Sequence, residues 1–261
     1  MNPSPELQAA LDAAAAAAQI ARALYRHNLD VRIKEDKTPV TEADVRCELA
    51  IRELLSARFP GYGFFGEETG RSAAAAESLW LVDPIDGTKA FIREYPMFST
   101  QIALMRAGEI VLGVSSAPVY GEIAWAERGR GAFLNGERVA VSAVDSIEAA
   151  ALSSGNLKSL AGGPGWQAYG ALVARVGRIR GYGDFLHYHL LSSGKIDAVI
   201  ESDVNILDVA AAAAILTEAG GRFTDLAGRP IGLDSQSVLA TNGRLHAPIM
   251  AALAPPDRRG R

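Results

Sequence analysis

Cysteine is almost absent from this chain of 261 residues, which contains Cys47 and no other. A single cysteine excludes an internal disulfide, a CxxC redox pair and a cysteine-based zinc site, and it is typical of a reducing compartment. Because Cys47 falls inside an expected helix, we interpret it as a small packing residue. Histidine is also scarce: His187 and His189 are expected on a strand or at its end, without a third zinc ligand nearby, and are interpreted as structural.

The chain also lacks a surplus of basic residues and any long apolar run. Lys and Arg total 26 against 30 Asp and Glu, a net charge of −4, so nucleic acid is not an expected partner. Apolar runs such as 209–216 are far shorter than the roughly 18 to 20 residues that a membrane span needs. The first residues show neither the positive charge nor the cleavage pattern of a signal peptide. These features predict a cytoplasmic protein with no membrane partner.

Motifs of several enzyme classes are missing as well. The sequence contains no G-x-S-x-G nucleophile turn, no G-x-x-x-x-G-K-[ST] phosphate loop and no G-x-G-x-x-G dinucleotide motif. With 49% apolar and 21% charged residues, it is nevertheless typical of a globular protein with a substantial core.

The periodicity of apolar residues predicts a mixed α/β protein of α+β character. Helices are expected at 6–28, 41–59, 166–176, 207–219 and 246–253. Strands are expected at 64–65, 79–82, 100–105, 110–115, 122–126, 197–201, 222–225 and 238–240. A loop or hairpin arm is expected at 34–40. A change of pattern near residue 145 predicts an N-terminal α+β half at 1–145, a C-terminal α/β half at 146–254 and a solvated tail at 255–261.

The most informative segment follows the apolar strand 78–82. Asp83 comes at the end of that strand, and Asp86 follows three residues later. A tight turn here can direct both carboxylates and the Ile85 carbonyl into one small volume. These are hard oxygen ligands of the kind that Mg²⁺ prefers, so the segment predicts a cation site.

The next two residues, Gly87 and Thr88, add a possible anion site. If a helix begins there, their N–H groups face an anion at its N-terminus. A cation site beside an anion site is what a phosphate monoester requires. The alternative is a purely structural Asp-Pro-x-Asp-Gly turn.

Three further acidic residues gain meaning only beside that segment. Glu67 follows the strand-like pair 64–65, and by itself this position is typical of a solvated turn. The default role of Asp208 is the N-cap of a helix. Asp44 belongs to a capping box that begins at Thr41.

Together these segments resemble the signature set of the inositol monophosphatase family. The matching segments are 41–44, 66–68, 80–88 and 208–221, in the family's order, within 34–246. The resemblance implies a layered αβαβα fold of the inositol monophosphatase and fructose-1,6-bisphosphatase type. It also implies a Mg²⁺-dependent, lithium-sensitive phosphatase that is usually dimeric, with active-site groups from both halves.

The resemblance implies a role for each matching residue. The implied metal ligands are the side chains of Glu67, Asp83, Asp86 and Asp208 and the carbonyl of Ile85. They hold two Mg²⁺ ions and, through water on Glu67, a weaker third. Thr88 and Asp44 match the pair that orients and deprotonates the attacking water, and the amides of Gly87 and Thr88 match the phosphate contacts.

One position departs from the family pattern. Leu207 stands where the family usually has Trp, and we expect this to affect local geometry more than metal binding. A non-catalytic binding protein on the same fold is the rival class, and the full set of carboxylates weighs against it.

The substrate is harder to predict than the chemistry. Segments that resemble the histidinol-phosphate phosphatase branch are 38–44, 60–68, 86–92, 96–100 and 181–184, with Tyr188. An ammonium-bearing substrate favours acidic groups at the pocket mouth, so Asp184 and Glu201 are the expected contacts. We therefore favour hydrolysis of L-histidinol phosphate to L-histidinol, in histidine biosynthesis. In the alternative, Asp184 caps a turn and Glu201 binds the hydroxyls of inositol-1-phosphate; adenosine 3′,5′-bisphosphate is a third candidate.

Overall fold

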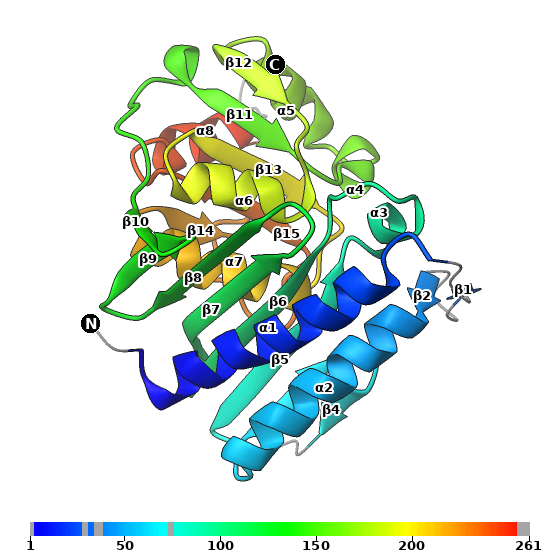
Figure 1. Ribbon diagram of the computed structural model, residues 1–261. Coiled ribbons are helices and arrows are strands. Elements are labelled where there is room, and N and C mark those ends of the chain that lie inside the picture. The colour runs from blue at the N-terminus through cyan, green and yellow to red at the C-terminus, as the bar shows by residue number, and fades with distance from the viewer. Residues whose placement is uncertain (1–2, 28–30, 34–38, 73–75, 255–261) are drawn as a thin grey trace.

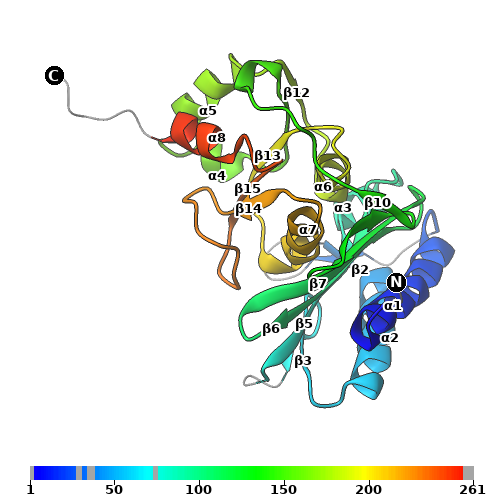
Figure 2. The same cartoon turned by 90° about the vertical axis from the view of Figure 1, so that its left-hand side faces the viewer.

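The computed structural model describes residues 3–27, 31–33, 39–72 and 76–254. Helices and sheets alternate in an αβαβα arrangement (Figure 2). Helices α1 (Pro5–Leu24) and α2 (Glu42–Arg58) cover one face of an eight-stranded sheet. Helices α6 (Asp184–Ser192) and α7 (Ile206–Glu218) lie between that sheet and a five-stranded one. The outer layer consists of α4 (Lys158–Ala161), α5 (Trp166–Val173) and α8 (His246–Leu253). The layered fold expected from the resemblance is confirmed.

The eight-stranded sheet has the order β10-β9-β8-β7-β6-β5-β3-β4 (Figure 1). Neighbouring strands are antiparallel except β3 and β5, which are parallel. The strands are β3 (Gly63–Gly66), β4 (Gly70–Ser72), β5 (Ser78–Asp86), β6 (Ser99–Arg106), β7 (Glu109–Ala117), β8 (Glu122–Glu127), β9 (Gly131–Leu134) and β10 (Glu137–Val139). The short helix α3 (Thr88–Ile92) follows β5 directly.

The five-stranded sheet has the order β12-β11-β13-β15-β14. Its strands are β11 (Ala151–Ser154), β12 (Arg178–Arg180), β13 (Ala198–Ser202), β14 (Arg222–Thr224) and β15 (Ser237–Thr241). Ala198 and Ile200 pack with α5 and α8, whereas Val199 packs with α6 and α7. This alternation follows from the two-residue period of a strand, because both faces of β13 are covered by helices. A 3₁₀ turn (Ile147–Ala149) precedes the sheet, and β1 (Val31–Ile33) pairs separately with β2 (Pro39–Thr41).

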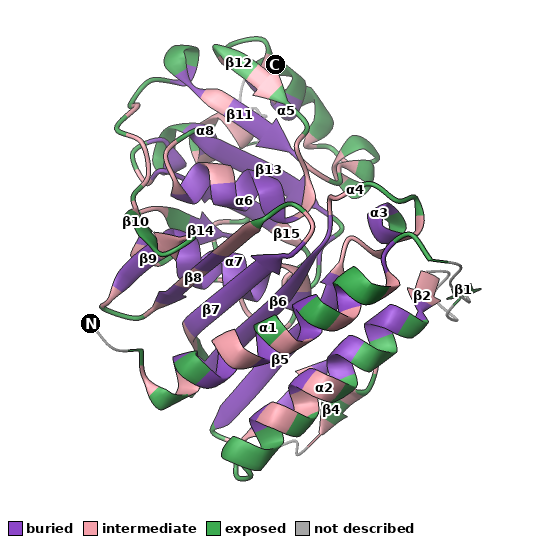
Figure 3. Ribbon diagram, viewed as in Figure 1, coloured by how far each residue is buried: buried purple, intermediate pink, exposed green. Residues whose placement is uncertain are grey.

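Helix α7 is apolar on nearly all sides because it is enclosed between the two sheets (Figure 3). Its alanine run allows a close approach to β7: a Cβ placed on Gly113 would lie 2.5 Å from the carbonyl oxygen of Ala211. This close contact fixes the position of the first turn of α7, which carries Asp208, relative to the large sheet.

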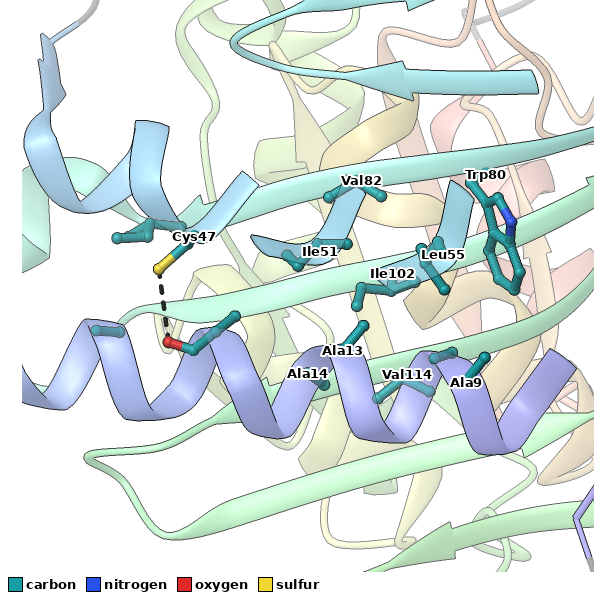
Figure 4. Close-up of a cluster of buried hydrophobic side chains, with 14 of the residues drawn as sticks. Ala9, Ala13, Ala14, Cys47, Ile51, Leu55, Trp80, Val82, Ile102 and Val114 are labelled. Atoms are coloured by element: carbon teal, nitrogen blue, oxygen red, sulfur yellow. Dashed lines mark hydrogen bonds between the residues drawn. The ribbon is translucent and has the colours of Figure 1, made fainter. Parts of the chain in front are cut away.

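The alanines of α1 allow a similarly close approach on the other face (Figure 4). Ala9, Ala13 and Ala14 pack in the same core as Ile51 of α2 and Val114 of β7. Cys47 is buried there and its thiol lies 3.5 Å from the carbonyl oxygen of Ala17. Burial raises the pKa of this thiol to about 12. The interpretation of Cys47 as a packing residue is confirmed.

Most expected elements are present, but two expectations are wrong. His187 and His189 lie in helix α6 rather than on a strand. Strand β5 continues to Asp86 instead of ending at Val82. The expected loop residues 34–38 and the tail 255–261 lie outside the described residues, and the division near residue 145 stays a prediction.

None of the helices in the described part of the chain combines the length and the apolar character needed to cross a membrane.

Candidate active site

A cavity of about 440 Å³ opens where β5, α3, α6 and α7 converge. Its charged lining is almost entirely acidic, formed by Glu67, Asp83, Asp86, Asp184, Asp203 and Asp208. Lys89 is the one basic residue among the described residues that line it. Such a cavity repels a phosphate ester unless cations neutralise it.

Three of these carboxylates form a tight group. Asp83, Asp86 and Asp208 each offer an oxygen, and these oxygens all lie within 4.8 Å of one another. The sequence brings Asp83 and Asp86 together locally, and α7 adds Asp208 from more than a hundred residues further along the chain. The three candidate ligands are therefore brought together as the sequence predicts.

An irregularity in β5 turns both aspartates toward the cavity. Asp83 pairs with Gln101 and Asp86 with Ser99, and the register shifts between them. Pro84 has no N–H to give to the ladder, which favours a bulge at this point. The Ile85 N–H donates to Asp83 Oδ1 at 3.0 Å. The strand thus bends at its end without terminating, which is why the expected end at Val82 is wrong.

Asp208 is held by a capping box rather than acting as the N-cap itself. The N-cap of α7 is Asn205, whose N–H donates to Asp208 Oδ2 at 2.9 Å. The Asn205 side-chain amide donates to Asp208 Oδ1 at 2.8 Å. Asp208 is the third residue of the helix, so the default N-cap role is corrected. These two bonds fix the rotamer of a carboxylate that faces the cavity.

Glu67 reaches the site because β3 and β5 are parallel. Gly66, the last residue of β3, pairs with Val82, so the residues that follow, Glu67 and Asp83, lie side by side. The Glu67 N–H donates to the Val82 carbonyl at 3.1 Å.

The turn that carries Glu67 is held by Glu48 of α2, a residue that the sequence analysis does not identify. Glu48, fully buried, accepts hydrogen bonds from the N–H groups of Glu68 at 2.7 Å and Thr69 at 2.8 Å. A Cβ on Gly66 would lie 2.4 Å from the Glu48 carboxyl carbon, so a larger residue there would displace the Glu48 carboxylate from these hydrogen bonds. Glu48 is four residues after Asp44 on one helix face, and this spacing was the available signal.

Asp44 takes the capping-box role expected from the sequence and also lies beside Thr88. Its Oδ2 accepts from the Thr41 N–H at 2.8 Å and the Thr41 hydroxyl at 2.6 Å, which confirms the capping box. Its Oδ1 lies 3.1 Å from the Thr88 hydroxyl, which is also 3.1 Å from the Ile85 carbonyl oxygen. Burial, more than the nearby Glu67, raises the pKa of Asp44, while the hydrogen bonds from Thr41 and Thr88 oppose that rise.

Gly87 connects β5 to α3 in a conformation suited to glycine. Its φ is 89°, and a Cβ there would lie 2.5 Å from the Met97 carbonyl oxygen. The backbone of Gly87 and Thr88 therefore lines the cavity without a side chain at the tightest point.

Asp184 and Glu201 occupy different positions relative to the cavity. Asp184 lines it as the first residue of α6, with a φ of 46°, an uncommon conformation that Asp tolerates better than most residues. Glu201 is buried behind it, outside the cavity lining. Its carboxylate accepts from the Tyr188 hydroxyl at 2.7 Å and the Asn156 N–H at 3.2 Å, and His187 Nε2 is 3.3 Å away.

The pKa values reflect how much negative charge is crowded here. Burial, followed by the neighbouring carboxylates, raises the pKa of Asp83 and Asp86 well above the usual range. The same causes raise the pKa of Asp208 to about 7 and that of Asp184 to about 6. Glu201 differs, because His187 and its hydrogen bonds outweigh burial and lower its pKa. A group of crowded oxygen donors with raised pKa values fits a hard divalent cation, which would stabilise all of them in ionised form.

This crowding predicts a dependence of stability on pH and on Mg²⁺. Because the folded-state pKa of Asp208 is about 7, against 3.8 ordinarily, its stabilising contribution is complete below the lower value and is lost as pH rises through the higher one. In a chelator, we expect the melting temperature to fall by a few degrees between about pH 5 and about pH 8. Saturating Mg²⁺ should raise it, more at the higher pH.

The comparison that isolates this effect is Asp208→Asn, since burial lowers the pKa of His189 and His246 and shifts stability in the opposite direction. The variant should melt higher than the natural protein at the higher pH without metal, and it should respond less to Mg²⁺. Identical melting curves for the two proteins under all four conditions would contradict this interpretation.

A second prediction concerns Glu48→Gln. The amide can accept at one oxygen only, and its NH₂ group then faces a backbone N–H, so the turn that carries Glu67 should loosen. We expect the Mg²⁺ concentration for half-maximal activity to rise about tenfold, as for other residues that support metal ligands. The control is Glu53→Gln, an exposed position on the same helix; equal behaviour of the two variants would refute the role of Glu48.

Comparisons with known proteins agree with this geometry. The sequence model of the inositol monophosphatase family matches residues 2–255. A histidinol-phosphatase of Mycobacterium tuberculosis is 41% identical over 232 residues, 86% of this chain and 89% of the relative. An inositol-1-monophosphatase of Caulobacter vibrioides is 36% identical over 253 residues, 91% and 98% of the two chains. The solved structure of the extragenic suppressor protein suhB from Bartonella henselae superposes with a TM-score of 0.88 at 30% identity, covering 99% of this chain and 100% of that one. The protein is therefore a phosphoric monoester hydrolase that belongs to the inositol monophosphatase family.

Proposed function

We propose that the protein is a Mg²⁺-dependent phosphatase that hydrolyses L-histidinol phosphate to L-histidinol and inorganic phosphate. The observation that carries the chemistry is the convergence of Asp83, Asp86 and Asp208 in one cavity with Thr88, whose hydroxyl is bonded to the buried Asp44. Metal dependence belongs to the family; Mg²⁺ as the ion and an occupancy of two to three ions are part of the proposal.

The residues present suit such ions. Glu67, Asp83, Asp86 and Asp208 would hold them, together with the Ile85 carbonyl oxygen, which lies at the cavity wall. When bound, Mg²⁺ supplies the positive charge that offsets the phosphate dianion and favours the ionisation of water. All the donors are oxygen atoms, which Mg²⁺ prefers over softer metals.

Thr88 and Asp44 are suited to orient the attacking water and to take its proton. The Thr88 hydroxyl donates toward Asp44 Oδ1, so its lone pairs are free to accept a hydrogen bond from water. The raised pKa of Asp44 makes it a better proton acceptor near neutral pH than an ordinary carboxylate. No cysteine, serine or histidine is among the described residues that line the cavity, which supports direct displacement by water.

The phosphate group would lie against the first turn of α3. The Gly87 and Thr88 N–H groups line the cavity there and can donate to phosphate oxygens. Lys89 follows immediately and contributes a positive charge at the same end of the cavity.

The choice of substrate rests on the acidic wall opposite. Histidinol phosphate carries an ammonium group, and Asp184 offers a carboxylate at the cavity surface. Glu201 supports it through its charge, since Glu201 is one cause of the raised pKa of Asp184. Relatives named histidinol-phosphatase, such as the Mycobacterium tuberculosis protein, are consistent with this choice.

Inositol-1-phosphate is the second candidate, favoured by the inositol-1-monophosphatase relative of comparable coverage. For this substrate, the Glu201 carboxylate would have to bind the inositol hydroxyls. Both Glu201 oxygens already accept hydrogen bonds from Asn156 and Tyr188, which leaves less capacity for this task. Adenosine 3′,5′-bisphosphate has no comparable support among the residues at the site.

Cytoplasmic location, a homodimer, lithium sensitivity and a place in histidine biosynthesis complete the proposal. The single, buried cysteine supports the first of these. The others rest on the family resemblance.

The test compares phosphate release from histidinol phosphate, inositol-1-phosphate and adenosine 3′,5′-bisphosphate, with and without Mg²⁺, in the natural protein and in Asp184→Asn. We expect Mg²⁺-dependent kcat/KM to be highest for histidinol phosphate. Asp184→Asn should raise KM for that substrate by about tenfold or more, because a charge-assisted contact is lost, and should leave inositol-1-phosphate nearly unaffected.

The matched control is Asp203→Asn, an acidic residue of the same cavity whose carboxylate is bonded to Ser159. Equal losses in the two variants would point to general electrostatics rather than recognition by Asp184. A higher kcat/KM for inositol-1-phosphate would overturn the choice of substrate and retain the chemistry.

A further inference from the structure

A continuous chain of hydrogen-bonded polar side chains runs from Asp86 along one face of the large sheet, over successive strands, to the partly exposed Glu122. Its members in order are Asp86, Ser99, Gln101, Ser115, His189 and Glu122. Glu122 is partly exposed, whereas Ser99, Gln101, Ser115 and His189 are buried. Such a chain beside the candidate metal site is unusual, because a buried polar group destabilises the fold unless it is hydrogen-bonded.

The strand register places these residues on one face of the sheet. Asp86 pairs with Ser99, and Gln101 pairs with Ser115 on the next strand. Ser99 and Gln101 are two residues apart, so their side chains point to the same side. That side faces α6, which contributes His189.

The hydrogen-bond directions along the chain are mutually consistent. The Ser99 hydroxyl donates to Asp86 Oδ2 at 3.2 Å, and the Gln101 amide donates to Ser99 Oγ at 2.8 Å and to Ser115 Oγ at 3.1 Å. The Ser115 hydroxyl is then left to donate to His189 Nε2, 2.9 Å away.

His189 links Ser115 to Glu122 in its neutral form. Nδ1 lies 2.9 Å from Glu122 Oε2 and carries the proton, which leaves Nε2 to accept from Ser115. Burial lowers the pKa of His189, which agrees with this assignment. The hydroxyl of Ser115 therefore donates to His189, and the hydroxyl of Ser99 donates to Asp86.

The side-chain oxygen of Gln101 indicates that the chain does more than satisfy the hydrogen-bonding groups of buried residues. Gln101 uses both N–H bonds on the two serines, and its Oε1 is buried without a hydrogen-bond partner among the described residues. A leucine or valine at that position would avoid this cost. We therefore infer that Gln101 has a role in orienting the hydroxyls of Ser99 and Ser115.

We propose that this chain is a positioning device for the metal ligand Asp86, in which His189 acts through Ser115, Gln101 and Ser99 to keep the Asp86 carboxylate oriented toward the cations. The proposal rests on the proposed metal function of Asp86. Without the chain, Asp86 is repelled by Asp184, Asp208 and Glu201 and gains freedom to turn away from the site. Residues that hydrogen-bond to metal ligands commonly affect metal affinity in this way.

The experiment measures Mn²⁺ binding directly, by calorimetry and by the electron paramagnetic resonance of free Mn²⁺, in the absence of substrate. The test variants are Ser99→Ala, Ser115→Ala and His189→Leu, with Ser115→Thr as the variant that keeps the hydroxyl. The matched control is Ser116→Ala, the same change on the same strand but on the opposite face of the sheet, outside the chain.

We expect the Kd for Mn²⁺ to rise about tenfold in Ser99→Ala and by a smaller factor in Ser115→Ala and His189→Leu. Ser115→Thr and Ser116→Ala should bind as the natural protein does. The double variant Ser99→Ala/His189→Leu should bind no more weakly than Ser99→Ala alone, because both changes break the same chain.

Unchanged Mn²⁺ affinity in Ser99→Ala, Ser115→Ala and His189→Leu, with melting temperatures lowered as in Ser116→Ala, would overturn the positioning role and leave the proposed function intact. Additive losses in the double variant would also overturn it, since the residues would then act independently. Failure of the natural protein to bind Mn²⁺ would overturn the proposed function as well, so the two failures are distinguishable.

Discussion

Mutual repulsion of carboxylates is the constraint on which the rest of this structure depends. Asp83, Asp86 and Asp208 place oxygens within 4.8 Å of one another in a largely buried setting, with Glu67 and Asp184 beside them. In isolation such a group favours protonation or separation, and the raised pKa values express this. A rigid scaffold holds these side chains together, and bound cations would turn their arrangement into a favourable one while all of them stay ionised.

The scaffold meets that demand with close backbone contacts and with hydrogen bonds to the candidate ligands or to the turn that carries them. Gly113 allows α7 to pack closely against the large sheet, and this contact fixes the position of Asp208 relative to β5. Asn205 holds Asp208, Glu48 holds the turn that carries Glu67, and Ser99 bonds to Asp86. The candidate ligands come from β5, the turn after β3 and α7, so the site depends on the correct packing of these elements against each other.

Local sequence was sufficient where the chemistry is local. The segment from Asp83 to Thr88 contains two candidate ligand side chains, a carbonyl and a candidate anion-binding turn, and its interpretation needs no tertiary contacts. Glu67 and Asp208 are different, because each alone has a common structural role. Their interpretation as ligands rests on the order of segments that the family shares. The parallel pairing of β3 with β5 brings Glu67 to the site, and the packing of α7 brings Asp208 there.

What sequence reasoning missed depends on contacts between distant elements. Helix α6 is buried between the two sheets and so lacks the amphipathic period of a surface helix, which is why the sequence pattern favours a strand for His187 and His189. The chain from Asp86 to Glu122 requires the register of four strands and the placement of α6, none of which a local pattern specifies.

The most direct test of the central claim is Mg²⁺-dependent phosphate release by Asp83→Asn, measured together with its melting temperature in a chelator. We expect turnover to disappear because the residue shared by the proposed cation sites loses its charge. The melting temperature should be equal to or higher than that of the natural protein, since a buried negative charge is removed. Near-normal Mg²⁺-dependent turnover in this variant would contradict the assignment of the site.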